Sequence, residues 1–402
     1  MIKINSDSSH NDKFDITNDI KLEIRKLIDC YLKNERSCVV ADYCFKDEPL
    51  PLKKIEKNDC RLFNSMPLSY NILFRMYFLP VIPILTGPNR HKFGQAVGAN
   101  PFGTDWKILY EHLIKHGANR MVAGDHSKFD KRMTADVLLG AFQVIVDMTN
   151  YQYVSAKQIE HLFPFMTEED FEKLGSISDF HSKILQGLIT DLVYCVVNVF
   201  NTLVLLSGNN PSGQPLTTIV NGVVNLMYLD IAYQILSEEN KFKGEFFDLV
   251  SPLVYGDDNV FGVSSKIPWY NHTEISRVLS CMGLKYTMAD KESISVPYIN
   301  IKDVEFLKRK FVKRNKIVYA PLDEASILKS LHMCTRSKNI CFEEQNAQII
   351  YSANMEYYQH GKEIFEQEYK RLNKYLDKYH LRSYLKGNIL PNFEDFKEKF
   401  NH

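Results

Sequence analysis

Apolar and polar residues follow two different patterns along the chain, and the change falls near residue 320. Before it, apolar runs rich in β-branched and aromatic residues predict strands at 38–47 and hairpins at 193–206 and 250–263. Helical spacing of apolar residues predicts helices at 19–36, 133–150 and 214–238. From residue 321 onward the pattern is almost wholly helical. We therefore expect an α+β fold with a helical C-terminal lobe.

Length and composition fit a globular protein with a sizeable core. The chain has 402 residues, of which 45% are hydrophobic, so two to four domains or one large body with lobes is expected. The 49 basic residues equal the 49 acidic residues in number. This balance argues against a basic coat over the whole surface, but equal totals can hide separate basic and acidic patches.

The eight cysteines and the apolar segments narrow the class of protein further. No C-x-x-C pair occurs, which favours reduced thiols over a zinc site. The first fifteen residues contain no apolar run, so no secretory signal is expected. The apolar stretch at 193–206 is 14 residues long and is interrupted by two asparagines, so it is too short to span a bilayer and no membrane segment is expected.

The most informative motif is Tyr255-Gly-Asp257-Asp258, which stands between two apolar runs. The flanks predict a tight turn at the end of a buried sheet. Two carboxylates there are unfavourable unless a cation neutralises them, and Asp oxygens suit Mg²⁺ or Mn²⁺. An ordinary hairpin turn is the alternative.

Asp125 and Asp130 form a second carboxylate pair. Apolar residues precede Asp125 and predict a strand that ends there, and Asp130 follows near the start of the next helix. Strand-end carboxylates from different elements can hold two cations about 4 Å apart, as phosphoryl and nucleotidyl transfer require. Alternatively, Asp130 caps the helix.

A Gly/Asn/Pro/Ser loop leads into the predicted helix at 214–238. Ser212 and Gly213 would allow this loop to move and to approach a backbone or a ribose closely. Thr217 and Asn221 are four residues apart and fall on one helix face, where they could meet Asp130 and a ribose 2′-OH. Helix capping and bonding to the local backbone is the alternative.

Basic residues gather in two segments. Segment 46–61 has five bases and four acids, a net charge of +1, whereas 302–316 has seven bases and two acids, a net charge of +5. The second segment predicts strands with one basic face, which suits a phosphate backbone, although a solvated face is the common alternative. Lys291, after a small loop, could donate a proton to a leaving group.

The motifs D-x₄-D, P-S-G-x₃-T-x₃-N and Y-G-D-D, in this order, resemble those of RNA-dependent RNA polymerases of picornavirus-like positive-strand RNA viruses. The wording of 125–133 looks closest to dicistrovirus-like and marine picorna-like members. The resemblance implies a right hand with a partial set of fingers, because the family's motif F already begins at residue 46. The implied domains are fingers at 1–115 and 140–205, palm at 116–139 and 206–314, and thumb at 315–402.

The resemblance also implies a role for each candidate residue. Asp125, Asp257 and Asp258 would hold two Mg²⁺ ions, with Mn²⁺ as a possible substitute, and Lys291 would be the general acid. The residues implied to bind the NTP are Lys46, Lys54, Arg61, Asp130, Ser212, Gly213, Thr217 and Asn221. Lys308 and Arg309 would contact RNA. Leu50 and Asp59 depart from the basic residues that many members carry at these positions.

The implied partners are template and primer RNA, NTPs, a small genome-linked protein primer and other viral replication proteins. The implied location is the host cytoplasm, in membrane-associated replication complexes. Two other functions stay open from the sequence. One is a reverse transcriptase, which shares the hairpin and the two-metal chemistry, and the other is a truncated polymerase-like module that binds RNA without extending it.

Overall fold

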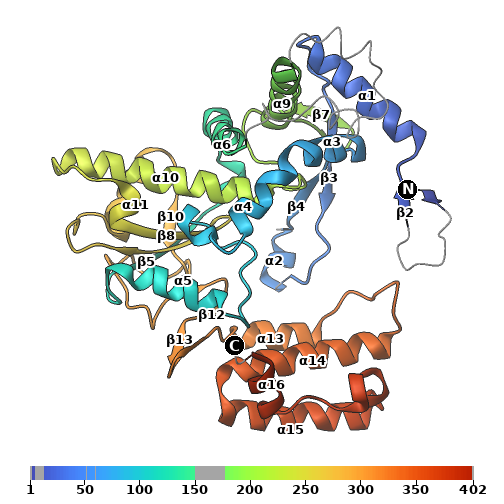
Figure 1. Ribbon diagram of the computed structural model, residues 1–402, viewed down its shortest axis with the longest axis vertical. Helices are drawn as coiled ribbons and strands as arrows, with labels where there is room; N and C mark the ends of the chain where they lie inside the picture. Colours follow the sequence, from blue (N-terminus) through green and yellow to red (C-terminus); the bar gives the residue numbers. More distant parts are fainter. Residues whose placement is uncertain (1, 5–12, 51, 59, 150–176, 401–402) are drawn as a thin grey trace. The chain divides into compact units, whose positions relative to one another are not determined.

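The computed structural model describes residues 2–4, 13–50, 52–58, 60–149 and 177–400 (Figure 1). The chain forms two compact units, and each is made of two separate segments. Unit 1 contains Met1–Gly87 and Lys128–Met227, and unit 2 contains Pro88–Ser127 and Tyr228–His402.

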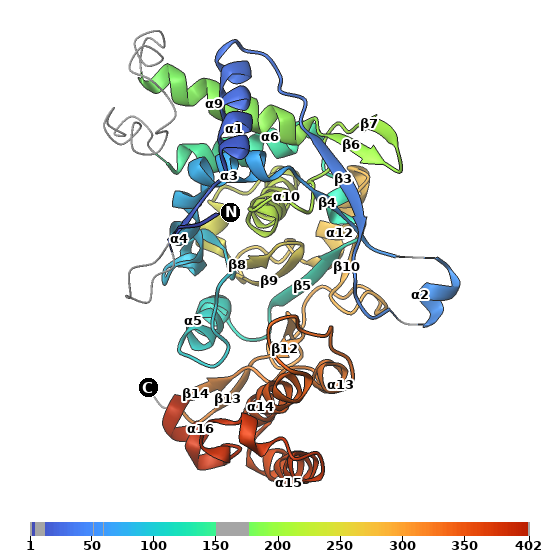
Figure 2. The ribbon, with the colours of Figure 1, turned by 90° about the vertical axis from the view of Figure 1, so that its right-hand side faces the viewer.

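Unit 1 is built on a four-stranded sheet in the order β4-β3-β6-β7 (Figure 2). The strands are β3 Val40–Phe45, β4 Leu62–Ser65, β6 Val196–Val199 and β7 Thr202–Leu205. β3 runs antiparallel to β4 and parallel to β6, and β6 and β7 form a hairpin. A short β1–β2 pair, Ile2–Ile4 with Lys13–Asp15, precedes it.

Helices supply most of the core of unit 1. They are α1 Asn18–Leu32, α3 Leu68–Phe78, α4 Ile82–Thr86, α6 Ala135–Asp147, α9 Ile177–Val193 and the first part of α10 Thr217–Glu239. The short helix α2 Leu52–Glu56 is exposed and buries no residue. The rings of Phe74, Phe78 and Phe142 are all buried, with centroids 4.4 Å apart for the first pair and 5.7 Å for the second. Aromatic rings at these separations contribute beyond the area that they bury.

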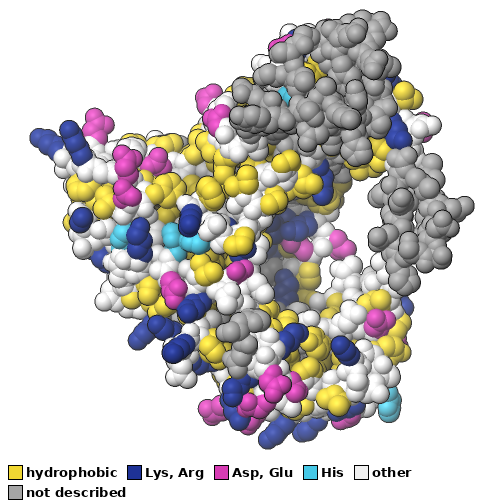
Figure 3. Space-filling view, in the orientation of Figure 1, with side chains coloured by type: hydrophobic (Ala, Val, Ile, Leu, Met, Phe, Trp, Pro, Cys, Tyr) yellow, Lys and Arg dark blue, Asp and Glu magenta, His cyan; other side chains and the backbone are white. Residues whose placement is uncertain are grey.

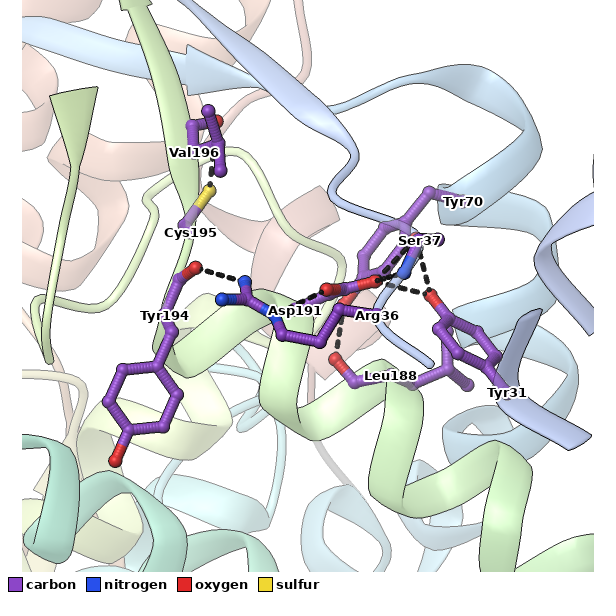
Figure 4. Close-up of polar contacts among 9 residues, drawn as sticks. All are labelled: Tyr31, Arg36, Ser37, Tyr70, Leu188, Asp191, Tyr194, Cys195 and Val196. Carbon is purple, nitrogen blue, oxygen red and sulfur yellow. Dashed lines mark hydrogen bonds and ion pairs between the residues drawn. The ribbon is translucent and has the colours of Figure 1, made fainter. Parts of the chain in front are cut away.

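A buried carboxylate joins helix α9 to the chain that follows α1 (Figure 4). Asp191 accepts hydrogen bonds from the Tyr31 hydroxyl at 2.9 Å and from the Arg36 Nε at 3.1 Å. The backbone N–H of Ser37 donates to the same carboxylate at 3.2 Å, and the hydroxyl of this serine is also a partner. Asp191 is only 1% exposed, so these donors replace the water that it loses.

The sheet of unit 2 is antiparallel, in the order β10-β5-β9-β8. Its strands are β5 Met121–His126, β8 Val250–Tyr255, β9 Asp258–Val263 and β10 Tyr286–Met288. The helices of this part are α5 Asp105–Leu113, α11 Phe246–Leu249 and α12 His272–Cys281. Every residue of β5 is buried. Burial on both faces matches its sequence, in which Met121–Ala123 are all apolar and the polar Asp125 and His126 stand at the end.

The rest of unit 2 is a helical lobe preceded by short strands. The strands are β11 Glu305–Phe306, β12 Arg309–Lys310, β13 Val312–Arg314 and β14 Ile317–Tyr319. The helices are α13 Glu324–His332, α14 Phe342–His360, α15 Lys362–Lys378 and α16 Phe393–Phe400. Tyr358, Phe365 and Phe396 are buried among these helices. On the face in Figure 3, basic and acidic side chains are interspersed over this lobe.

The predicted elements are confirmed: the helices near 19–36, 133–150 and 214–238, the two hairpins, the strand near 38–47 and the helical C-terminal lobe. The borders of fingers, palm and thumb stay a prediction, and the two packing units follow other borders. Residues 128–139 and 206–227, assigned above to the palm, belong to unit 1. Residues 88–115, assigned above to the fingers, belong to unit 2, because Trp106 of α5 stacks on Phe311 at 4.7 Å and shares the core beneath β8 and β9.

The length argument based on residues 193–206 does not hold, because longer apolar stretches occur elsewhere in the chain. Two helical stretches, Leu68–Thr86 and α10, are long and apolar enough to cross a membrane. The sequence argument failed because a few dispersed polar residues, such as Asn221 and Asn225, hide the apolar character of α10. In the structure 67% of its most apolar window is buried, as in the core helix of a globular protein.

We predict that Asp191→Ala lowers the free energy of unfolding by about 3 kcal/mol, because the Tyr31 hydroxyl and the Ser37 N–H lose a buried acceptor. Asp179→Ala on the same helix is the control, since its exposed ion pair with Lys183 contributes only about 0.5 kcal/mol. Urea and thermal unfolding measure both variants. Equal, small effects would contradict the stabilising role of the buried carboxylate.

Candidate active site

Two neighbouring strands bring three carboxylates to one end of the unit 2 sheet, where β5 ends and β9 begins. This end of the sheet is called its edge below. Asp125 stands near the end of β5, where Gly124 pairs with Asn259 of β9. Tyr255 pairs with Asp258 and closes the β8–β9 hairpin, so that Gly256 and Asp257 form its tip. Gly256 adopts a φ of +64°, which glycine tolerates without strain. The predicted turn at a sheet end is therefore present, and Asp125 lies beside it.

The three carboxylates lie close enough to disturb one another. Burial raises the pKa of Asp125, and the charge of Asp257 adds to this, while Lys291 lowers it. Burial and the charges of Asp257 and Asp125 raise the pKa of Asp258 to about 6. Both shifts oppose the ionised form, so this edge of the sheet would gain free energy from a bound cation.

A lysine supplies one positive charge to this site. The Lys291 Nζ lies 3.0 Å from Asp125 Oδ2, although the lysine side chain is 66% exposed and the aspartate side chain only 6%. The structure thus brings together Asp125, Asp257, Asp258 and Lys291, which are four of the residues that the sequence singled out.

A tyrosine and an asparagine under the carboxylates were not predicted. The Tyr286 hydroxyl donates to Asn259 Oδ1 at 2.6 Å, and both residues are buried. The Tyr286 ring lies across Gly124, where an added Cβ would meet ring atoms at 2.0 Å. Asn259 could have been noticed as a polar residue in an apolar strand, whereas nothing in the sequence marks Tyr286 as its partner.

The donor chemistry of this edge fits a divalent cation. Three Asp side chains offer hard oxygen ligands, and their mutual repulsion would be relieved by such an ion. Nevertheless, within the described ranges no three His, Cys, Asp or Glu side chains are already arranged to hold an ion. The carboxylates therefore need side-chain movement, including at the Lys291 pair, before they can act as a ligand set.

A second polar cluster lies in unit 1. Asn221 of α10 donates to Asp130 Oδ1 at 2.5 Å and accepts from the Asn210 amide at 2.6 Å. Gln214 donates to Asn210 Oδ1 at 3.2 Å. The predicted meeting of Asp130 and Asn221 is confirmed by this bond. Asn210 and Gln214 were missed, although both stand in the polar loop that the sequence marked.

The capping alternatives have different outcomes. Asp130 lies inside the short 3₁₀ turn Phe129–Lys131, and the N-cap of α6 is Thr134, so Asp130 does not cap that helix. Thr217, in contrast, donates to the backbone oxygens of Gln214 at 2.8 Å and Pro211 at 3.4 Å. The Thr217 hydroxyl thus bonds to the local backbone, which was the alternative to a ribose contact.

The loop before α10 packs tightly in unit 1. An added Cβ at Gly213 would meet the Asn64 carbonyl oxygen at 1.4 Å, so only glycine fits against this strand. Ser212 beside it is half-buried. The sequence predicted that this loop approaches a backbone closely. In the structure Gly213 approaches the backbone of β4.

The basic candidates divide by their contacts. Lys46 and Arg61 flank one acid, Glu48, at 3.5 Å and 3.4 Å. Lys54 is exposed on α2. Among the charges of segment 302–316, two arginines face inward: Arg309 pairs with Glu356 of α14 at 2.7 Å, and Arg314 donates to the backbone oxygen of His360 at 2.8 Å.

These inward contacts correct the expectation of one basic face over segment 302–316. Its strands are short, and Arg309 is held by a two-point bond to a carboxylate inside the lobe. Lys308 is exposed, 3.5 Å from the Ser326 hydroxyl. The contact of Lys308 and Arg309 with RNA stays a prediction.

An antiparallel sheet with a strand-end aspartate beside an Asp-Asp hairpin, followed by a helical lobe, defines the palm and thumb of a right-hand polymerase. A solved structure of a Sicinivirus 3Dpol RNA-dependent RNA polymerase has this fold, with a TM-score of 0.69 over 94% of this chain and 70% of that one, at 18% identity. A family model described as viral RNA-dependent RNA polymerase matches residues 8–379, and the chain belongs to this family.

Curated relatives are large viral polyproteins. The chain is 31% identical over 320 residues to the RNA1 polyprotein of Beet ringspot virus, which covers 79% of this chain and 13% of that one. It is 27% identical over 336 residues to the replicase polyprotein of Cricket paralysis virus, which covers 80% and 18%. The chain thus spans between about an eighth and a fifth of the length of these relatives.

The comparisons confirm the picorna-like resemblance and the α+β right-hand fold. They also favour an RNA-directed RNA polymerase over a reverse transcriptase. Enzymes of this family depend in general on divalent metal ions.

We predict that Gly124→Ala destabilises the protein by about 2 kcal/mol, because the methyl group must displace the buried Tyr286 ring. Gly103→Ala is the matched control: its Cβ would meet only the Asn100 side chain, at 3.2 Å, which can turn away. Thermal unfolding compares the two. A Gly124→Ala variant as stable as Gly103→Ala would contradict the packing described for β5.

Proposed function

We propose that this chain catalyses template-directed RNA synthesis, in which an RNA 3′-OH attacks the α-phosphate of an NTP and pyrophosphate leaves. The observation that carries the proposal is the convergence of Asp125, Asp257 and Asp258 at one sheet edge in a member of the viral polymerase family. The proposed setting is replication of a viral RNA genome, because the relatives are replicase and RNA1 polyproteins.

We propose Asp125 and Asp257, with support from Asp258, as the ligands of two Mg²⁺ ions. When bound, such ions would neutralise charge on the attacking oxygen, the transferring phosphate and the leaving group. The chain's own part is to hold three oxygen ligands on β5 and on a short hairpin. Sheet elements position ligands more rigidly than loops do.

Selection of ribose over deoxyribose is proposed for the unit 1 cluster. Asp130 offers an acceptor and the Asn221 amide a donor, and a 2′-OH needs one of each. Asn210 donates to Asn221, and Gln214 donates to Asn210, so both residues fix the position of the Asn221 amide. Thr217 and Ser212 complete the proposed nucleotide-binding set through the loop that leads into α10.

The triphosphate is proposed to contact Lys46, Lys54 and Arg61. Glu48 keeps two of these cations paired in the described protein, and the phosphate charge would replace that carboxylate. Lys291 is proposed as the acid that protonates pyrophosphate, and Lys308 with Arg309 as primer contacts. Other viral replication proteins, a genome-linked protein primer and membrane-associated complexes in the host cytoplasm belong to the same proposal, supported by family membership.

Asp257→Ala is expected to reduce primer extension roughly a thousandfold or more, because a metal ligand at the reacting phosphate is lost. RNA binding should stay within a few-fold of wild type. Asp248→Ala removes an exposed acid of α11 and serves as the control. Primer extension with Mg²⁺ and a filter-binding assay measure both. If wild-type protein binds RNA but shows no Mg²⁺-dependent extension, the non-catalytic RNA-binding module is the correct function.

Asn221→Ala and Asp130→Ala are expected to reduce the preference for NTP over dNTP by about tenfold, because each removes one side of the proposed ribose contact. Gln143→Ala, an exposed amide on α6, is the control. The ratio of kcat/KM values for ATP and dATP measures the effect. Unchanged discrimination in both variants would refute the assignment, and a wild-type preference for dNTP would favour a reverse transcriptase.

A further inference from the structure

The lysine in the carboxylate site reaches Asp125 through a tight turn. In the β10–β5 pair, Thr287 stands opposite Asp125, and the chain then turns back so that the Lys291 N–H donates to the Met288 carbonyl at 2.8 Å. Lys291 has a φ of +66°, a conformation that a lysine adopts at a cost. Such a backbone is retained where the surrounding contacts impose it.

The next residues fix this turn from the other side. The carboxylate of Asp290 accepts from the backbone N–H groups of Glu292 at 3.1 Å and Ser293 at 2.9 Å. The Ser293 hydroxyl is a further partner. The ammonium group is therefore delivered to Asp125 by an ordered turn and not by a freely moving side chain alone.

The ion pair is asymmetric. The Asp125 carboxylate is buried, whereas two-thirds of the Lys291 side chain is exposed. An exposed ammonium group regains its hydration when it leaves, so the pair is weak and can be exchanged. A divalent cation on the same oxygen would repel the ammonium at 3.0 Å, so the two cations compete for Asp125.

We propose that Lys291 acts as a resident counter-ion that closes the metal site until a divalent cation displaces it from Asp125. This inference rests on the proposed metal ligands and assigns Lys291 a second role, as a positioning residue. Displacement would both complete the carboxylate set and release the ammonium group toward the leaving pyrophosphate. The exchange of Lys291 for a metal ion at Asp125 would thus couple metal binding to the release of the proton donor.

The test measures Mn²⁺ binding to the full chain without RNA or nucleotide. The electron paramagnetic resonance signal of free Mn²⁺ reports how much of the ion is bound. Lys291→Met is expected to tighten the Mn²⁺ Kd about fivefold, the factor that corresponds to loss of an exposed competing ion pair. Lys291→Arg keeps the charge and should bind Mn²⁺ as wild type does. Lys285→Met removes an equal charge just before β10 and should also leave the Kd unchanged.

The outcomes separate the two proposals. Asp125→Asn should abolish the tight site, which shows that the measured ion binds at the carboxylates. Equal Mn²⁺ affinity in wild type, Lys291→Met and Lys291→Arg would overturn the resident counter-ion and leave the metal ligands standing. No Asp125-dependent binding in any variant would overturn the proposed metal site, and the role of Lys291 with it. Weaker binding in Lys291→Met would also contradict competition.

Discussion

Burial of carboxylates next to one another is the constraint on which the candidate site depends. Burial at the edge of a sheet makes the ionised forms unfavourable, and each neighbouring charge adds to that cost. The rigid antiparallel sheet prevents Asp125 from moving away, since β5 is paired on both sides and buried along its length. A cation bound there would relieve both effects, because it would stabilise the ionised carboxylates. This is the property that a site proposed to bind a small, doubly charged cation requires.

Unit 1 handles its polar groups differently. Asp130, Asn221, Asn210 and Gln214 satisfy one another through direct hydrogen bonds, so the cluster is ordered without a ligand. Asp191 is likewise satisfied by its protein neighbours. Unit 1 thus holds preorganised hydrogen-bonding groups, whereas unit 2 holds carboxylates whose ionised forms are disfavoured by burial and by one another. The proposed function uses both kinds of site, the first to read a sugar and the second to carry out phosphoryl chemistry.

Local patterns sufficed for the hairpin at Gly256, for the strand before Asp125 and for the helix that carries Asn221, because each depends on residues close in sequence. Long-range contacts were not predictable in the same way. Nothing near Trp106 indicates that it stacks on Phe311, more than 200 positions later. Arg309 looked like one of many surface cations, and only the position of Glu356 on another helix turns it inward. The pairing of Lys291 with Asp125 depends on a left-handed turn that lysine rarely adopts, so propensity argued against it.

The chain crosses between its two units three times, after residues 87, 127 and 227. During synthesis, unit 1 therefore cannot be completed until residue 227 has left the ribosome. More than a hundred residues also separate β5, the strand with Asp125, from the hairpin at 250–263 with which it pairs. β5 is a continuous apolar strand that would stay unpaired during this interval, and such strands are prone to aggregation. Rapid elongation through the middle of the chain, or a chaperone that holds it, would thus favour correct folding.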